Sequence, residues 1–261
     1  MKLIPMAIWG ALVSAALPAF APALAALPAR LCGTETVMLL PDGRLLGHLH
    51  YYEEDPKDLV PAPQGFAQGQ PCRIHRAVWA DLEALLTGAK ASGISGISGI
   101  SCYRSIAHQS AVFCSQIGPR KASRTAAERS ISVAPPAYSE HATGYAIDFA
   151  VPRVPHCREL TGCIAQTPGG QWLLAHAPSY GFELSFPDGN TQGVTYEPWH
   201  WRWVGRSAIA PGAVDARALF AQARAQFPAN PWVPGEAIAA PELLPTPRLI
   251  DWTLPLLGRK R

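Results

Sequence analysis

Six cysteines constrain the fold of this chain more than any other feature, and all of them follow an uncharged N-terminal segment. They are Cys32, Cys72, Cys102, Cys114, Cys157 and Cys163. An even number of cysteines is typical of disulfide-bonded proteins in oxidising compartments. Six cysteines allow 15 connectivities, and pairing of neighbours along the chain predicts Cys32–Cys72, Cys102–Cys114 and Cys157–Cys163. The chain contains no Cys-x-x-Cys pair, which disfavours a structural zinc knuckle.

The N-terminal segment has the pattern of a secretory signal peptide. Lys2 precedes an apolar stretch, no charged residue occurs in residues 3–29, and Ala23-Leu24-Ala25 forms a small-residue cleavage site. We therefore expect residues 1–25 to be a signal peptide and the protein to be secreted, periplasmic or facing the cell wall. The alternative is an uncleaved membrane anchor, which prolines within the apolar stretch disfavour.

The composition indicates one globular domain with an appendage rather than a disordered chain. Of 261 residues, 48% are hydrophobic and 16% are charged, against about 25% charged in average soluble domains. The 26 prolines and 22 glycines predict a loop-rich fold. A formal charge of +3 without a basic cluster argues against nucleic acid as a partner.

Hydrophobic periodicity and turn signals predict an α+β fold, with a mainly antiparallel sheet and packed helices. The alternation through residues 145–151 indicates a strand, and Ser105 and Thr167 are expected to cap helices. The predicted strands are 45–51, 145–151, 182–186 and 200–204, and the predicted helices are 74–91, 105–117, 167–177 and 214–226. We expect one domain over residues 26–213, followed by a C-terminal helix and a Pro-rich tail over residues 214–261.

The first segment with possible chemistry is Ser139-Glu140-His141-Ala142-Thr143-Gly144-Tyr145-Ala146-Ile147-Asp148. On a helix, His141 and Asp148 would be separated by about 10.5 Å of rise, too far to share one ion comfortably. A sharp turn at Gly144 into the following strand would let the two side chains converge. The alternative is a capping serine, a surface histidine and a carboxylate satisfied within the sheet.

The second segment is Glu197-Pro198-Trp199-His200. An imidazole that binds zinc and a nearby free carboxylate that takes a proton from water are what a zinc hydrolase needs. The alternative is a core strand in which Glu197 pairs with Arg202. Taken together, the two segments supply His141, Asp148 and His200 as ligands and Glu197 as a base.

These motifs resemble the VanY-type D-alanyl-D-alanine carboxypeptidases, the M15B zinc peptidases. The resemblance covers about residues 42–205 and includes Ser-x-His-x-x-Gly-x-Ala-x-Asp, then Glu-Pro-Trp-His, after Tyr103-Arg104-Ser105-x-x-x-Gln109. It implies a single zinc-peptidase domain with Zn²⁺ on His141, Asp148 and His200, and Glu197 as the catalytic base. It also implicates Arg104, Gln109, Ser139 and Trp199 in substrate binding. The family usually has glycine at the position of Cys102.

The resemblance implies a secreted enzyme that removes the C-terminal D-alanine from peptidoglycan stem peptides. Arg104 suits such an enzyme because a guanidinium can hold a terminal carboxylate with two parallel hydrogen bonds; the alternative is an arginine in a surface ion pair. Other possible functions are an L,D-carboxypeptidase acting on tetrapeptide stems and a non-catalytic cell-wall binding module, although a binding module would not need Glu197. We expect the loops around residues 152–168 to select the substrate, and no stable membrane span if the signal peptide is cleaved.

Serine and cysteine catalysis are disfavoured. No lysine follows a serine by three positions, so the Ser-x-x-Lys motif of serine D,D-peptidases is missing. The six cysteines are even in number and expected to pair, which leaves no thiol for a cysteine peptidase.

Overall fold

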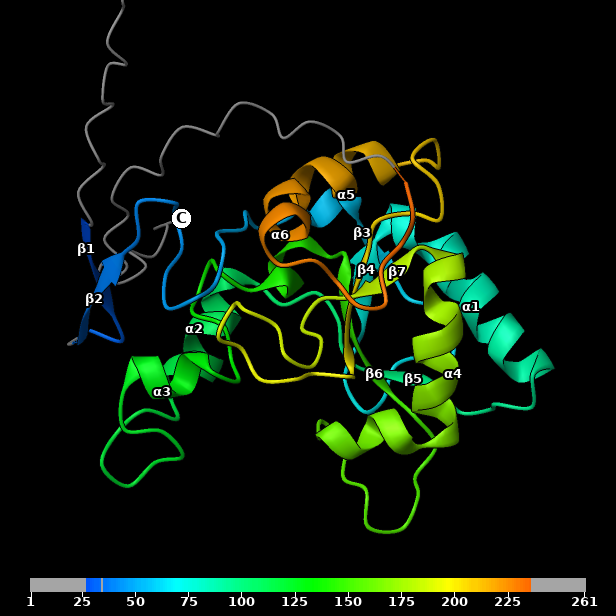
Figure 1. The fold of residues 1–261 in the computed structure, drawn as a ribbon, viewed down its shortest axis with the longest axis horizontal. Coiled ribbons are helices and arrows are strands. Elements are labelled where there is room, and N and C mark those ends of the chain that lie inside the picture. Colours follow the sequence, from blue (N-terminus) through cyan, green and yellow to red (C-terminus); the bar gives the residue numbers. More distant parts are fainter. Residues whose placement is uncertain (1–26, 34, 236–261) are drawn as a thin grey trace, which may run out of the picture.

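A four-stranded antiparallel sheet lies at the centre of the molecule (Figure 1). In the computed structural model, which describes residues 27–33 and 35–235, its order is β5 (Ser98–Ser101), β6 (Ala146–Ala150), β8 (His200–Trp203) and β7 (Phe182–Leu184). The sheet and its surrounding helices confirm the predicted α+β class. The predicted signal peptide and residues 236–261 lie outside the described residues.

The two faces of this sheet differ in chemistry. Directly opposed residues of antiparallel strands point to the same face. Trp201 is opposite both Ile147 and Leu184, so this face is apolar and packs into the main core. On the other face Asp148 is opposite His200, and Arg202 is opposite Glu183. The sheet therefore presents a buried row of ionisable side chains away from its apolar core.

The described part of the chain contains six α-helices (Figure 1). They are α1 (Trp79–Ala91), α2 (Ile106–Cys114), α3 (Ala126–Ser130), α4 (Pro168–His176), α5 (Ala213–Leu219) and α6 (Ala221–Gln226). The side chains of Ser105 and Thr167 accept hydrogen bonds from His108 N and Gly170 N, which confirms both predicted caps. The short 3-10 helices are η1 (Pro56–Asp58), η2 (Arg76–Val78), η3 (Glu140–Thr143), η4 (Gly162–Gln166) and η5 (Ala177–Tyr180).

A second, smaller core lies under the hairpin of β1 (Leu27–Leu31) and β2 (Glu35–Leu39). Leu31 and Val37 of the hairpin belong to the same apolar cluster as Phe113 of α2 and Ala126 of α3. Another short hairpin pairs β3 (Leu59–Pro61) with β4 (Arg73–His75). Among the described residues, no helix combines the length and hydrophobicity that crossing a membrane requires.

The disulfides correct two of the three predicted pairings. The bridges are Cys32–Cys114, Cys72–Cys102 and Cys157–Cys163. Only Cys157–Cys163 was predicted; Cys32–Cys72 and Cys102–Cys114 are wrong. The turn after β1 lies against the end of α2, so Cys32 meets Cys114, a cysteine 82 positions away. Cys102 is thereby left to bond Cys72, which precedes β4.

Three predicted elements also differ from the structure. The predicted strand over residues 45–51 is wrong, because this segment has only isolated bridges, which Leu45 forms with Leu39 and with His48. The helix predicted from residue 74 begins at Trp79, since residues 73–75 pair with β3. The helix predicted over residues 214–226 is divided at Phe220, whose ring is fully buried against Tyr51 and Tyr145. After α6, the chain packs against β7, where Leu184 N donates a hydrogen bond to Pro231 O.

Candidate metal centre and active site

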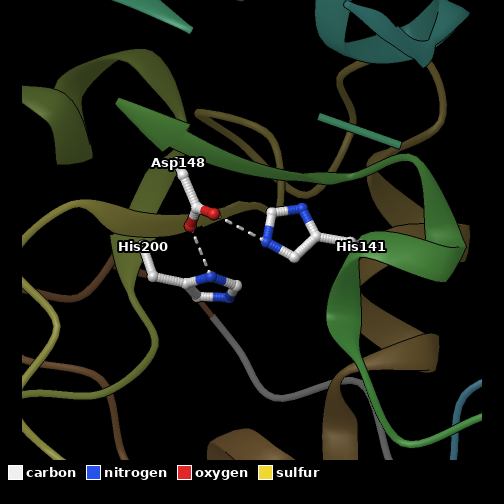
Figure 2. Close-up of side chains that lie close together, drawn as sticks. All are labelled: His141, Asp148 and His200. Atoms are coloured by element: carbon white, nitrogen blue, oxygen red, sulfur yellow. Dashed lines mark hydrogen bonds and ion pairs between the residues drawn. The ribbon is translucent and has the colours of Figure 1, made fainter. Parts of the chain in front are cut away.

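His141, Asp148 and His200 converge on one point (Figure 2). Asp148 lies between the two imidazoles, with Oδ2 3.1 Å from His141 Nε2 and Oδ1 2.9 Å from His200 Nδ1. All three side chains are buried, and one ligand atom from each lies within 4.8 Å of the others. The structure therefore brings together the three predicted ligands.

Strand register and one glycine produce this convergence. Asp148 and His200 are direct partners across β6 and β8. His141 belongs to η3, which ends at Gly144 with φ +70°, and the chain then enters β6. A Cβ at Gly144 would lie 2.6 Å from Leu59 Cδ2, so neither the backbone conformation nor the packing accepts a side chain there. The expected turn at Gly144 is confirmed.

Each imidazole has its second nitrogen held by an acceptor. His141 Nδ1 lies 2.7 Å from the carbonyl oxygen of Cys102, and His200 Nε2 lies 3.0 Å from Glu140 Oε2. In a neutral imidazole one nitrogen donates and the other accepts. With these partners, His141 presents Nε2 and His200 presents Nδ1 toward Asp148. Outer acceptors of this kind orient metal-binding histidines in proteins.

The electrostatics suit a cation. Burial lowers the pKa of His141, so this imidazole is neutral. Burial opposes charge on Asp148, but the contacts with His141 and His200 hold the pKa of the carboxyl well below its usual value. Burial also disfavours charge on His200, yet its hydrogen bonds to Asp148 and Glu140 raise its pKa to about 10. A cation at this point would take the place of the proton between His200 and Asp148.

The donor set fits a zinc ion. Two imidazole nitrogens and one carboxylate oxygen are a common protein ligand set of catalytic zinc, which keeps a further position open. Within residues 27–33 and 35–235, this is the one cluster of histidine, cysteine and acidic side chains found able to hold a metal. The cluster lines a pocket of about 450 Å³.

Glu197 lines the same pocket and is 6% exposed. Its backbone N donates to Phe186 O, and His200 N donates to Glu197 O, which places the carboxyl beside the start of β8. Burial raises the pKa of Glu197 to about 8. The alternative pairing of Glu197 with Arg202 is wrong, because Arg202 binds Glu140 and Glu183 instead.

Arg104 enters the pocket from the segment between β5 and α2. Its backbone N donates to His141 O, which ties this segment to η3. Arg104 Nε is buried and has no hydrogen-bond partner within the described part of the chain. Burial lowers the pKa of the guanidinium, while Asp148 and Glu197 act to raise it. This arginine has donor capacity left for a ligand.

The other predicted substrate-binding residues divide into two groups. Ser139 and Trp199 line the pocket, and Ser139 Oγ also accepts from His141 N. Gln109 does not line it: the residue is 1% exposed, and its Nε2 donates to the carbonyl of Ala134, which does line the pocket. The structure therefore places Gln109 behind the pocket wall.

Glu140 is a site residue that sequence reasoning missed. Its carboxylate contacts His200 and is 4% exposed. The only signal in the sequence was a charged residue between Ser139 and His141, and the local pattern did not show that it turns inward.

A family model matches the part of the chain that contains the site. The family model "VanY: D-alanyl-D-alanine carboxypeptidase" matches residues 72–206, which include every predicted site residue. YodJ of Bacillus subtilis (strain 168) is 35% identical over 130 residues, 49% of this chain and 45% of YodJ. A D-alanyl-D-alanine carboxypeptidase of Enterococcus faecalis is 31% identical over 134 residues, 49% of this chain and 47% of the relative.

Among solved structures, the LD-carboxypeptidase LdcB has a TM-score of 0.52 at 27% identity, over 62% of this chain and 75% of LdcB. This chain spans less than half the length of the curated relatives that it matches. The family match covers more than half of the chain, including both segments of the candidate metal site and Arg104. The chain therefore belongs to the VanY family of D-alanyl-D-alanine carboxypeptidases.

Proposed function

We propose that this protein is a secreted zinc-dependent carboxypeptidase that removes the C-terminal D-alanine from peptidoglycan stem peptides. The observation that carries the proposal is the arrangement around one pocket: three buried metal ligands, a free carboxyl at Glu197 and an arginine with an unpaired nitrogen at Arg104. Family membership supports the substrate class.

The residues divide the chemistry between them. His141, Asp148 and His200 would hold zinc, which when bound supplies a Lewis acid that lowers the pKa of water toward ~7. Glu197 takes a proton from the attacking water and returns it to the amine of the departing alanine. The C–N bond of the peptide breaks, and the water oxygen remains on the new carboxyl group. Burial raises the pKa of Glu197 to about 8 in the metal-free site. A cation on the three ligands would lower this pKa and so favour the carboxylate that accepts the proton.

Recognition of the terminal carboxylate is assigned to Arg104. An exopeptidase must distinguish a free C-terminus from an internal peptide bond. A guanidinium can bind both carboxylate oxygens at once, and Arg104 lines the pocket that the ligands share. Burial lowers the pKa of the Arg104 guanidinium, and the charges of Asp148 and Glu197 act against that shift.

The disulfides support secretion. All six cysteines are paired, as expected in an oxidising compartment. We keep residues 1–25 as the proposed signal peptide and residues 26–213 as the proposed catalytic domain, followed by the C-terminal helix and tail. Helices α5 and α6 pack on this domain through Ala216, Phe220 and Ala223.

L,D-carboxypeptidase activity on tetrapeptide stems is the second candidate, favoured by the likeness to LdcB. Leu160, Thr161 and Gly162 line the pocket from the loop that Cys157–Cys163 closes. This loop lies within residues 152–168, where we expect the selection between stems. A non-catalytic binding module is less well supported, because it would not need a buried free carboxyl at Glu197.

Mass spectrometry of defined muropeptides tests the proposal. Purified mature protein is incubated with pentapeptide and tetrapeptide stems, with and without a chelator, and zinc is then restored. Loss of one alanine that the chelator abolishes and zinc restores is expected. The stem that shortens decides between D,D- and L,D-activity. A zinc-loaded protein that shortens neither stem would contradict the proposed activity.

A further inference from the structure

Glu140 is held by four hydrogen bonds from four different side chains. Its Oε1 accepts from Arg202 Nη1 at 3.0 Å and from the Tyr51 hydroxyl at 3.3 Å. Its Oε2 accepts from the Ser185 hydroxyl at 2.6 Å and from His200 Nε2 at 3.0 Å. Glu140 is buried, and a carboxylate with this many donors has little freedom to turn.

The partners of Glu140 are those of a carboxylate. The Arg202 guanidinium pairs with Oε1, and the hydroxyl groups of Tyr51 and Ser185 donate one hydrogen bond to each oxygen. Surrounded by these donors, Glu140 is placed to accept a hydrogen bond from His200 Nε2 rather than to donate one.

The support for Glu140 comes from the polar face of the sheet. Arg202 follows His200 by two positions in β8, so both side chains point to the same face. Arg202 Nε also donates to Glu183 Oε1 at 2.8 Å, and Glu183 in turn contacts Arg224 at 3.2 Å. Arg202 is thus fixed from one side and holds Glu140 from the other.

This arrangement selects the protonated nitrogen of His200. With its Nε2 proton donated to Glu140, a neutral His200 presents the lone pair of Nδ1 beside Asp148. Without Glu140, the proton could move to Nδ1 and be donated to Asp148, so that His200 would no longer present a lone pair at the site. For His141, the neutral carbonyl of Cys102 is the corresponding acceptor and fixes the proton on Nδ1.

We infer that Glu140 is the positioning residue of the metal centre: its carboxylate, fixed by Arg202, orients His200 and increases the basicity of Nδ1 as a metal ligand. The inference rests on the proposed zinc site and goes beyond the ligand set. Carboxylate partners of metal-binding histidines typically change metal affinity by about 10- to 100-fold when they are removed.

Zinc competition titrations of the full mature protein against a chromophoric chelator test this inference. Glu140→Gln keeps the shape of the side chain and an acceptor oxygen but loses the charge, so we expect about tenfold weaker zinc binding. Glu140→Ala removes the acceptor, so we expect a loss of about 100-fold. The visible spectrum of the Co²⁺-substituted protein is expected to change in Glu140→Ala and to return toward the wild-type spectrum in Glu140→Gln.

Asp81→Asn and Asp81→Ala are the matched controls. Asp81 is also a buried carboxylate with one arginine and one neutral donor, Arg206 and Trp203 Nε1, but it does not line the metal pocket. These variants are expected to lower thermal stability and to leave zinc affinity within about twofold of wild type. Loss of zinc affinity only in the Glu140 variants separates positioning from general destabilisation.

The outcomes distinguish this inference from the proposed function. If wild type binds zinc and folded Glu140→Gln and Glu140→Ala bind it equally well, the positioning role is overturned while the zinc site stands. If Glu140→Ala does not fold, Glu140→Gln decides alone, and wild-type affinity in that variant overturns the inference. Failure of wild type to bind zinc would overturn the proposed function, and this inference with it.

Discussion

Asp148 and His200 are direct partners across strands β6 and β8, with 2.9 Å between Asp148 Oδ1 and His200 Nδ1. Two of the proposed metal ligands are therefore placed by backbone register, and a slip of one residue would move either side chain to the apolar face of the sheet. His141 completes the set from η3, across the turn at Gly144. The rigidity of the site thus derives from sheet pairing and one short turn.

Replacing His200 should abolish metal binding. His200→Ala removes one ligand and leaves Asp148 and Glu140 without their shared partner. We expect loss of zinc and a decrease of about 1–3 kcal/mol in the free energy of unfolding of the metal-free protein. Zinc content after dialysis is the measurement, with the exposed His108→Ala as control. Stoichiometric zinc in His200→Ala would contradict the ligand assignment.

Replacing Arg104 should weaken recognition of a free C-terminus. Hydrogen bonds to charged groups contribute about 1.5–3 kcal/mol, so Arg104→Ala should lower kcat/KM by about 10- to 100-fold on peptides with a free carboxylate. Arg104→Lys should recover part of this loss, because lysine keeps the charge but not the paired donors. The control is Arg120→Ala, an exposed arginine that lies outside residues 152–168 and does not line the pocket.

A C-terminally amidated peptide gives the contrasting measurement for Arg104. Wild type should prefer the free acid, and Arg104→Ala should lose most of that preference. An unchanged ratio of the two rates in the variant would show that another residue binds the carboxylate.

Removing the Cys72–Cys102 bridge should affect both stability and the metal. The carbonyl of Cys102 accepts from His141 Nδ1, and Arg104 follows two residues later. Loop-closure entropy for a separation of 30 residues predicts a loss of about 3–4 kcal/mol in Cys72→Ser/Cys102→Ser. Zinc affinity should fall as well, because the acceptor that orients His141 is then less firmly placed.

Cys157→Ser/Cys163→Ser is the comparison for that experiment. Its separation of 6 residues predicts a loss of about 2 kcal/mol, and neither cysteine contacts a metal ligand. Chemical denaturation and zinc titration of both double variants give the two quantities. Equal effects on zinc affinity would show that the Cys102 carbonyl does not depend on its bridge.

The stability of the metal-free protein should depend on His48. Burial lowers the pKa of His48 to about 4. The hydrogen bond with the carbonyl of Ser130 and the charge of Glu140 act to raise this pKa, and His200 acts to lower it. An unfolded histidine titrates near 6.5, so between these values the unfolded chain binds more protons. This contribution is complete above pH 6.5 and is lost as the pH falls to 4, by up to about 3 kcal/mol.

His48→Gln isolates that contribution, because glutamine can still donate to Ser130 but does not titrate. Urea unfolding with a chelator, at pH 7 and pH 4.5, gives the pH dependence of both proteins. The variant should lose less stability on acidification than wild type. The same loss in both proteins would show that His48 is not held neutral by the fold.

The convergence of His141 and Asp148 was predictable because the segment that contains them obeys local rules. Alternation around Asp148 indicated a strand, and Gly144 indicated the turn that brings His141 to it. The helix caps at Ser105 and Thr167 were predictable for the same reason, since a cap depends on residues within one turn.

Features that depend on distant contacts were not predictable. Cys32 meets Cys114 because the β1–β2 hairpin packs on α2, a contact that chain order does not contain. Glu140 turns inward because Arg202, 62 positions later, supplies the opposite charge. Gln109 matches the family motif, yet its amide is used to hold Ala134.

In the proposed mechanism Glu197 acts as a base beside the three metal ligands and is not itself a ligand. The most direct measurement is zinc content and turnover of Glu197→Gln, determined on the same preparation as wild type. We predict stoichiometric zinc and a rate at least about 100-fold lower, the usual scale for loss of an acid–base group. Turnover close to that of wild type, with zinc bound, would contradict the central claim.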